Sequence, residues 1–172
     1  MKLAGEQLVL DTNILLHLLR GKKAAGFIER EYRISGRSPS AIISVVTKGE
    51  LKALGYKFNW GPTQHERLDA MLAGLPTADI SHSAVWNAYA KIDLFSNAHG
   101  VKMGKNDLWI AATTLVVGGV LLTTDADFDH LAPTGVKVER ILEDQLKSVP
   151  APDRTPVAAM PSGLPEGKDE VE

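Results

Sequence analysis

The sequence of 172 residues contains no cysteine. This absence excludes disulfide bonds, thiolate metal sites and cysteine nucleophiles, and it is compatible with a reducing compartment. Long apolar runs are also missing, because the longest, Ile110 to Leu122, is shorter than a membrane span and is interrupted by two glycines. The start, MKLAGEQLVLDTN, lacks the apolar core and the cleavage site of a secretory signal. We therefore expect a soluble, cytoplasmic protein without a membrane segment.

A dominant charge of one sign is missing too, since the net charge is −2. The overall charge therefore does not indicate nucleic-acid binding, and most local groups of lysine and arginine are solvated faces. Hydrophobic residues make up 44% and charged residues 23%, so the chain can form a packed core. The length favours a single domain.

Short apolar runs alternate with longer amphipathic stretches along the chain. We expect strands at residues 7–10, 41–44, 78–80 and 120–123, and a fifth within 136–141. We expect helices at about 14–20, 45–58 (capped by Ser44), 63–73, 81–99 and 107–117. Nearly continuous apolar strands that alternate with helices are typical of a parallel sheet covered on both faces. The predicted fold is α/β: one domain over residues 1–147, with a central parallel sheet of about five strands flanked by helices.

The composition changes near residue 148. The segment from 148 to 172 holds five of the nine prolines and ends in acidic residues. It has too little apolar surface to order itself, so we predict a disordered tail at residues 148–172.

Acidic residues fall at corresponding places in this pattern. Asp11 and Asp125 directly follow two of the strands, Glu50 lies early in the helix after another strand, and Asp107 opens its helix. The carboxyl ends of parallel strands meet at one edge of a sheet, where ligands bind. We therefore expect four carboxylates from distant parts of the chain to converge.

Four carboxylates without cations repel one another, which leads either to raised pKa values or to a bound hard cation. Without cysteine or a histidine pair at helical spacing, oxygen ligands favour Mg²⁺ or Mn²⁺ over zinc. Such ions assist phosphodiester hydrolysis by activating water and stabilising the leaving oxygen.

Each acid also has an ordinary structural interpretation. Asp11 can cap a helix, Glu50 can be a solvated helix residue, and Asp107 can complement a helix dipole. Asp125 and Asp127 can be turn residues. These interpretations stay open for each acid alone, but they do not predict that four of them lie at one end of one sheet.

The alternating aspartates of LLTTDADFDH also suggest two other kinds of site. An EF-hand loop requires glycine at its sixth position and glutamate at its twelfth, where this sequence has His130 and Val136. An aspartyl-phosphate phosphatase has a second aspartate two residues after the first, and Asn13 stands there. The first interpretation fails and the second is weakened.

Four segments, in order, resemble the motifs of PIN-domain ribonucleases, in particular the VapC toxins of prokaryotic toxin–antitoxin pairs. They are LVLDTNILLHLL, SVVTKGEL, KNDLWIAATTL and LLTTDADFDHL, and the resemblance extends from about residue 7 to residue 142. It implies a parallel-sheet α/β fold and Mg²⁺- or Mn²⁺-dependent endonuclease activity on RNA. The implied acidic cluster is Asp11, Glu50, Asp107 and Asp125, with Asp127 as an auxiliary metal ligand. Asp129 matches no motif residue, and we interpret it as a surface turn residue.

The resemblance also implies roles for other residues. Asn13 and Thr123 would orient the carboxylates or waters. Asp11, Asp107 and Asp125 would hold one or two ions, while Glu50 would hold a second ion or would orient or deprotonate the attacking water. Attack in line would leave a 3′-hydroxyl and a 5′-phosphate without a covalent enzyme intermediate. Three lysines near the motifs are candidates for phosphate contacts: Lys48, Lys52 and Lys105.

The implied partners are RNA, a second copy of the chain and a VapB-type antitoxin. One alternative is a stand-alone RNA-processing nuclease, and another is a non-catalytic scaffold, against which the presence of all four acids argues. Three aromatic residues, Tyr56, Phe58 and Trp60, favour core or dimer contacts over base stacking.

Overall fold

The computed structural model describes residues 2–147 of the chain. The predicted disordered tail at 148–172 lies outside these residues, so the tail and the domain boundary beside it stay predictions. None of the helices within residues 2–147 combines the length and the apolar character that crossing a membrane requires.

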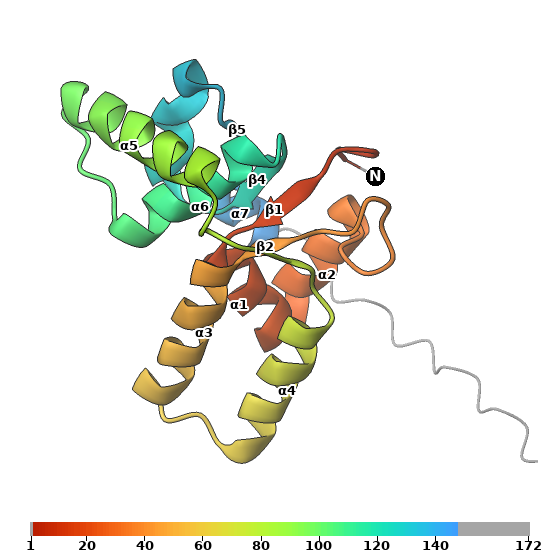
Figure 1. Ribbon diagram of the computed structural model, residues 1–172. Helices are drawn as coiled ribbons and strands as arrows, with labels where there is room; N and C mark the ends of the chain where they lie inside the picture. The colour runs from red at the N-terminus through yellow and green to blue at the C-terminus, as the bar shows by residue number, and fades with distance from the viewer. Residues whose placement is uncertain (1, 148–172) are drawn as a thin grey trace, which may run out of the picture.

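A parallel sheet lies at the centre of the molecule (Figure 1). Three strands pair in the order β1-β4-β5 and two pair as β2-β3. Their bounds are Leu8–Leu10 (β1), Ile43–Ser44 (β2), Thr77–Ala78 (β3), Val120–Thr123 (β4) and Lys137–Arg140 (β5). A parallel bridge from Val9 to Ile42, with hydrogen bonds of 2.9 Å from Leu10 N to Ile42 O and from Ile42 N to Leu8 O, joins the two groups. The order is therefore β3-β2-β1-β4-β5, and the predicted parallel sheet flanked by helices is confirmed.

Helices cover both faces of this sheet (Figure 1). Those whose apolar side chains join one core cluster are α1 (Thr12–Arg20), α2 (Lys22–Tyr32), α3 (Val45–Lys57), α4 (Pro62–Ala73) and α7 (Glu143–Lys147). The other cluster takes side chains from α5 (Ser83–Ala98), α6 (Lys105–Val116) and the 3₁₀ helix η1 (Ala126–Thr134).

Successive residues of the central strands belong to different clusters. Leu8, Leu10 and Leu122 are buried in the cluster with α1, whereas Val9 and Leu121 are buried in the cluster with α6. Because side chains alternate across a strand, an apolar residue at every position means that both faces are covered. This double burial explains why β1 and β4 are continuous apolar runs in the sequence.

The prediction of helices and strands was incomplete. Helix α2 was not predicted: its N-cap, Gly21, offers no side-chain hydrogen bond, and the helix is held by the burial of Phe27, Ile28 and Tyr32. The elements η1 and α7 were not predicted either. The third strand ends at Ala78, not at residue 80, and the Asp79 carboxylate beyond it accepts a hydrogen bond from Ser81 N at 3.0 Å.

One buried charge organises the loop after α2. Arg37 is only 6% exposed, and its guanidinium donates hydrogen bonds to four backbone carbonyls: Tyr32 at 2.7 Å, Leu3 and Glu6 at 2.8 Å, and Pro39 at 3.2 Å. We call this arrangement the Arg37 hub. It ties the N-terminal segment to the end of α2.

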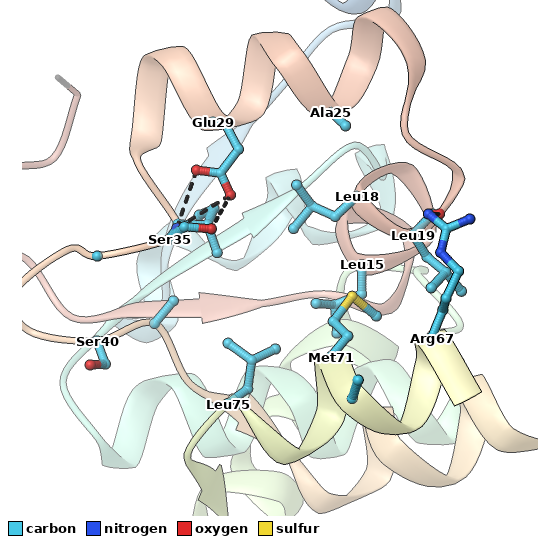
Figure 2. Close-up of a pocket in the computed structure, with 15 residues that line it drawn as sticks. Leu15, Leu18, Leu19, Ala25, Glu29, Ser35, Ser40, Arg67, Met71 and Leu75 are labelled. Atoms are coloured by element: carbon cyan, nitrogen blue, oxygen red, sulfur yellow. Dashed lines mark hydrogen bonds between the residues drawn. The ribbon is translucent and has the colours of Figure 1, made fainter. Parts of the chain in front are cut away.

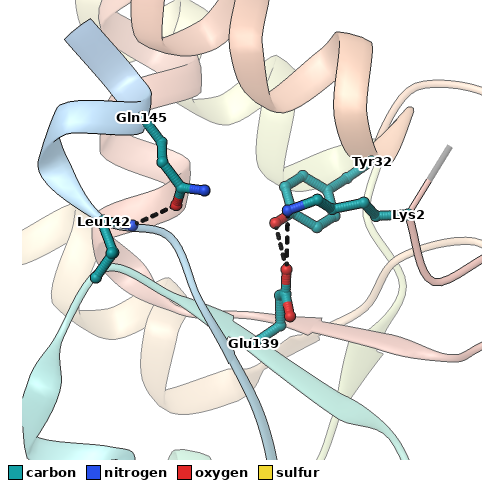
Figure 3. Close-up of polar contacts among 5 residues, drawn as sticks. All are labelled: Lys2, Tyr32, Glu139, Leu142 and Gln145. Carbon is teal, nitrogen blue, oxygen red and sulfur yellow. Dashed lines mark hydrogen bonds and ion pairs between the residues drawn. The ribbon is translucent and has the colours of Figure 1, made fainter. Parts of the chain in front are cut away.

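A second polar contact fastens the edge strand β5 (Figure 3). The Tyr32 hydroxyl donates to the Glu139 carboxylate at 2.7 Å, and the Lys2 ammonium lies 3.5 Å from the same oxygen. Farther along, Leu142 N donates to the side-chain oxygen of Gln145 at 2.8 Å.

Candidate active site

The order of the strands reverses between β1 and β4, whose carboxyl ends lie side by side. Leu10 pairs with Leu122, and Asp11 N donates to Leu122 O at 3.1 Å. In open parallel sheets, the crevice at such a reversal is the usual place for a ligand. The side chains that interact electrostatically there form what we call the acidic cluster: Asp11, Glu50, Asp107, Asp125 and Asp127.

Asp11 is the most enclosed member of the acidic cluster, with 4% of its surface exposed. It is the N-cap of α1, and its carboxylate accepts hydrogen bonds from Thr12 N at 2.6 Å and from the Thr123 hydroxyl at 2.5 Å. Burial, with smaller contributions from the charges of Glu50 and Asp125, raises the pKa of Asp11 to about 6, although these two hydrogen bonds act to lower it. The cap and the cluster are therefore two functions of one side chain.

Thr123 and Asn13 hold this part of the site in place. The Thr123 hydroxyl donates to Asp11 and accepts from Asp125 N at 2.9 Å and from the Asn13 amide at 3.3 Å. The Asn13 side-chain oxygen in turn accepts from Thr124 N at 3.2 Å. Thr123 thus contacts the Asp11 carboxylate directly, whereas Asn13 contacts Thr123 and no carboxylate of the acidic cluster among the hydrogen bonds of residues 2–147.

Glu50 joins the site from α3. Its carboxylate accepts hydrogen bonds from the Thr12 hydroxyl and, at 2.8 Å, from the Asn106 amide. These donors come from α1 and α6, so Glu50 is held between three helices. The sequence interpretation missed Thr12 and Asn106, and the only signal for them is their position beside Asp11 and Asp107 in the chain.

Asp107 lies in the first turn of α6, whose N-cap is Gly104. A Cβ atom at Gly104 would come within 2.5 Å of an Asp107 carboxylate oxygen, so glycine leaves the room that this carboxylate occupies. Burial and, to a smaller extent, the charges of the other four members together raise the pKa of Asp107 to about 6. Asp107 therefore lies within electrostatic reach of the whole acidic cluster.

Asp125 and Asp127 complete the acidic cluster after β4. Asp125 is the N-cap of η1, and its carboxylate accepts from Asp127 N at 2.9 Å. Asp129 is exposed and forms an ion pair of 2.9 Å with Arg140. The three alternating aspartates thus divide into two that belong to the cluster and one that pairs elsewhere.

The acidic cluster has no cationic partner among residues 2–147, since the ion pairs there involve other acids. Its donors are hard oxygens, which fits Mg²⁺ or Mn²⁺. No three acidic or histidine side chains of the described residues already form a metal-binding group. Mg²⁺ usually keeps several waters and binds through one or two carboxylates and a phosphate, so the arrangement is chemically suitable for that ion.

Two surface hollows differ in their relation to the acidic cluster. A pocket of about 590 Å³ between α1, α2 and α4 is lined mainly by apolar side chains such as Leu15, Leu18 and Met71, and by no cluster member (Figure 2). A groove of about 460 Å³ along α3 begins at the cluster; we call it the α3 groove. Its lining residues include Val46, Gly49, Glu50, Ala53, Lys57 and Asn106.

The three candidate lysines have different surroundings. Lys52 forms an ion pair with Asp69 of α4, and the Lys105 ammonium lies 3.6 Å from Asp93 of α5. Lys48 has no acidic partner among residues 2–147. Of the three, only Lys48 is free of competing carboxylates from the part of the chain that the structure describes.

One family model and several solved structures resemble this chain. The family model described as PIN domain matches residues 8–133. No protein among the curated ones matches the sequence. Similar solved structures include VapBC2 from Rickettsia felis bound to a DNA fragment from its promoter, with 20% identity, a TM-score of 0.65, and coverage of 78% of this chain and 98% of that one.

Two further structures are similar at the same level. VapBC-5 from Mycobacterium tuberculosis, a member of the VapBC family of toxin–antitoxin systems, has 21% identity and a TM-score of 0.58, over 79% of this chain and 99% of that one. VapBC-1 from nontypeable Haemophilus influenzae has 23% identity and a TM-score of 0.58, over 77% and 96%. At these identities, the likeness establishes the fold.

Proposed function

The chain belongs to the PIN-domain family, and on that premise we propose that it is a Mg²⁺- or Mn²⁺-dependent endoribonuclease. The observation that carries the proposal is the acidic cluster at the reversal of strand order. Its five carboxylates come from distant segments and have no cationic partner within residues 2–147. Such crowding opposes folding, but it suits a cation that recruits a phosphodiester.

In this proposal, Asp11, Asp107 and Asp125 hold the ion, with Asp127 as an auxiliary ligand. A divalent ion bound there lowers the pKa of a water and stabilises the leaving oxygen. Thr123 fixes the Asp11 carboxylate through its hydroxyl, and Asn13 fixes Thr123.

Glu50 is the remaining acid of the proposed mechanism. Held by Thr12 and Asn106, its carboxylate orients or deprotonates the attacking water, or holds a second ion. Attack in line with the leaving group gives a 3′-hydroxyl and a 5′-phosphate. Lys48, Lys52 and Lys105 contact neighbouring phosphates.

The fold likeness to chains of VapBC complexes supports the more specific role of a cytoplasmic toxin. In that role, the chain forms a homodimer and is inhibited by a VapB-type antitoxin. The alternative is a stand-alone RNA-processing nuclease. Expression in a bacterial host separates the two: a toxin arrests growth, Asp11→Asn abolishes the arrest, and a small protein encoded beside the gene relieves it.

Cleavage of total RNA by the purified full chain tests the activity itself. We expect discrete fragments with Mg²⁺ or Mn²⁺, none with EDTA and none with Asp11→Asn. The matched control is Asp129→Asn, which makes the same chemical change outside the acidic cluster and should cleave like the wild type. The proposal would be contradicted if the wild type still cleaved RNA in EDTA and the Asp11→Asn variant cleaved it as well. It would also be contradicted if the wild type cleaved no RNA.

A further inference from the structure

We propose that the α3 groove binds one nucleobase of the RNA, adjacent to the phosphate that is cleaved, and thereby sets the base preference of the enzyme. This inference rests on the proposed endoribonuclease function. Glu50 belongs to the acidic cluster and also lines the groove, so the groove borders the cluster at this residue. In the proposal, the base in the groove and the phosphate at the cluster belong to the same nucleotide strand.

The floor of the groove is open because the helix carries small residues there. Gly49 and Ala53 are four residues apart on α3 and hence lie on the same face. A Cβ atom at Gly49 would meet no other atom within 4 Å. The groove volume of about 460 Å³ is in the range of small-molecule sites. An open floor lined by small apolar residues can accept the face of a base.

Polar groups stand at both ends of this floor. At the cluster end, the Asn106 amide nitrogen donates to Glu50 at 2.8 Å. Because a carboxylate only accepts, the nitrogen must face Glu50, and the amide oxygen remains available to an amino group of a base. No residue within 2–147 donates to that oxygen. The polar edge of a base thus has a partner at this end.

At the other end, Lys57 is exposed and has no acidic partner among the described residues. Its ammonium lies 6.0 Å from the centre of the Phe58 ring. A cation at this position suits a phosphate of the same strand. Along the groove, a carboxylate and an amide are followed by the apolar floor and then by an ammonium group. This order of groups suits a nucleotide better than it suits an apolar side chain of a protein.

Filling the groove tests the inference. Gly49→Leu puts a side chain into the open floor, and leucine favours a helix interior more than glycine does, so the melting temperature should be equal or higher. We expect kcat/KM to fall about 10- to 100-fold, mainly through KM, because a base contact of this kind is lost. The bases found beside the cleavage sites should change as well. Gly49→Ala should give a smaller effect in the same direction.

The matched control is Gly61→Leu. Gly61 also has open space around its Cβ position and has a negative φ of −73°, but it does not line the groove. Cleavage by Gly61→Leu should equal that of the wild type. If the wild type cleaves RNA and Gly49→Leu cleaves the same sites at the same rate, the groove proposal is overturned while the nuclease stands. If the wild type cleaves no RNA, both fail. A Gly49→Leu variant that loses only the binding of a protein partner would also overturn it.

Discussion

The Arg37 hub and the acidic cluster both hold charge in or near the interior, and they differ in how that charge is matched. Arg37 donates to four carbonyls, so each side of the interaction has a partner. In the acidic cluster, Asp11 and Asp107 lie among other carboxylates, and both pKa values are raised to about 6. The hub therefore stabilises the fold by itself, whereas the cluster gains stability only when a ligand supplies positive charge.

This difference predicts that the two regions can be separated by mutation. Changes in the cluster should affect activity more than stability, and changes in the hub should do the reverse. Perturbed carboxylates gathered in a crevice are a general mark of functional sites, but ion-pair networks also perturb pKa values. Measuring activity and stability on the same variants distinguishes these cases.

The largest expected effect is that of Asp107→Asn on cleavage. Loss of a cation ligand should lower kcat/KM about a thousandfold, which corresponds to several kcal/mol. The free energy of unfolding in EDTA should stay the same or rise by up to about 1 kcal/mol, because repulsion is relieved. Cleavage assays and urea unfolding measure the two quantities. A clear loss of stability would instead make Asp107 a helix-terminal structural residue.

The next effect is that of Arg37→Ala on stability. Four carbonyls lose their donor, so the free energy of unfolding should fall by about 3–5 kcal/mol, while kcat/KM of the folded fraction stays unchanged. Arg37→Lys should not restore the lost stability, because an ammonium group does not reproduce the planar arrangement of N–H donors of a guanidinium. The control is Arg30→Ala, which removes an exposed ion pair with Glu31 and should cost less than about 0.5 kcal/mol. If Arg37→Ala and Arg30→Ala lowered the free energy of unfolding in urea by the same amount, the Arg37 hub would have no special role in stability.

The smallest effect is a pH dependence that only the cluster should produce. The pKa of Asp11 rises from 3.8 to about 6 on folding, so the folded state binds protons more tightly than the unfolded state. The stability that this gives is complete below the unfolded pKa and is lost as the pH rises through about 6. In EDTA, the free energy of unfolding should fall by about 1–2 kcal/mol between about pH 5 and about pH 7.5.

Two comparisons check the origin of this pH dependence. Asp11→Asn should reduce the slope without abolishing it, because the Asp11 carboxyl is gone while that of Asp107, whose pKa is also raised to about 6, still titrates. Added Mg²⁺ should stabilise the wild type most at the higher pH, since the ion binds ionised carboxylates. If the Asp11→Asn variant keeps the full slope of the wild type, groups other than Asp11 cause the pH dependence.

The parts of the fold that were predicted have strong local signals. The continuous apolar runs at Leu8–Leu10 and Val120–Thr123 indicated strands buried on both faces. Ser44 indicated the start of the helix at Val45–Lys57, and its hydroxyl accepts a hydrogen bond from Val46 N at 3.3 Å. By contrast, α2 has no side-chain cap, and its helical state depends on burial against distant residues. Local patterns do not reveal burial of that kind.

The sequence by itself determined which acids follow which strands, because side-chain alternation and apolar runs are local properties. Only the tertiary structure decided that β1 lies beside β4, which brings the Asp11 carboxylate onto the hydroxyl of Thr123, 112 residues away. It also decided the roles of two glycines: a Cβ at Gly104 would strike Asp107, whereas a Cβ at Gly49 would meet open space. Both residues are glycines, and what differs is the direction in which each faces: Gly104 faces the Asp107 side chain, which points into the acidic cluster assembled from distant segments, whereas Gly49 faces open space.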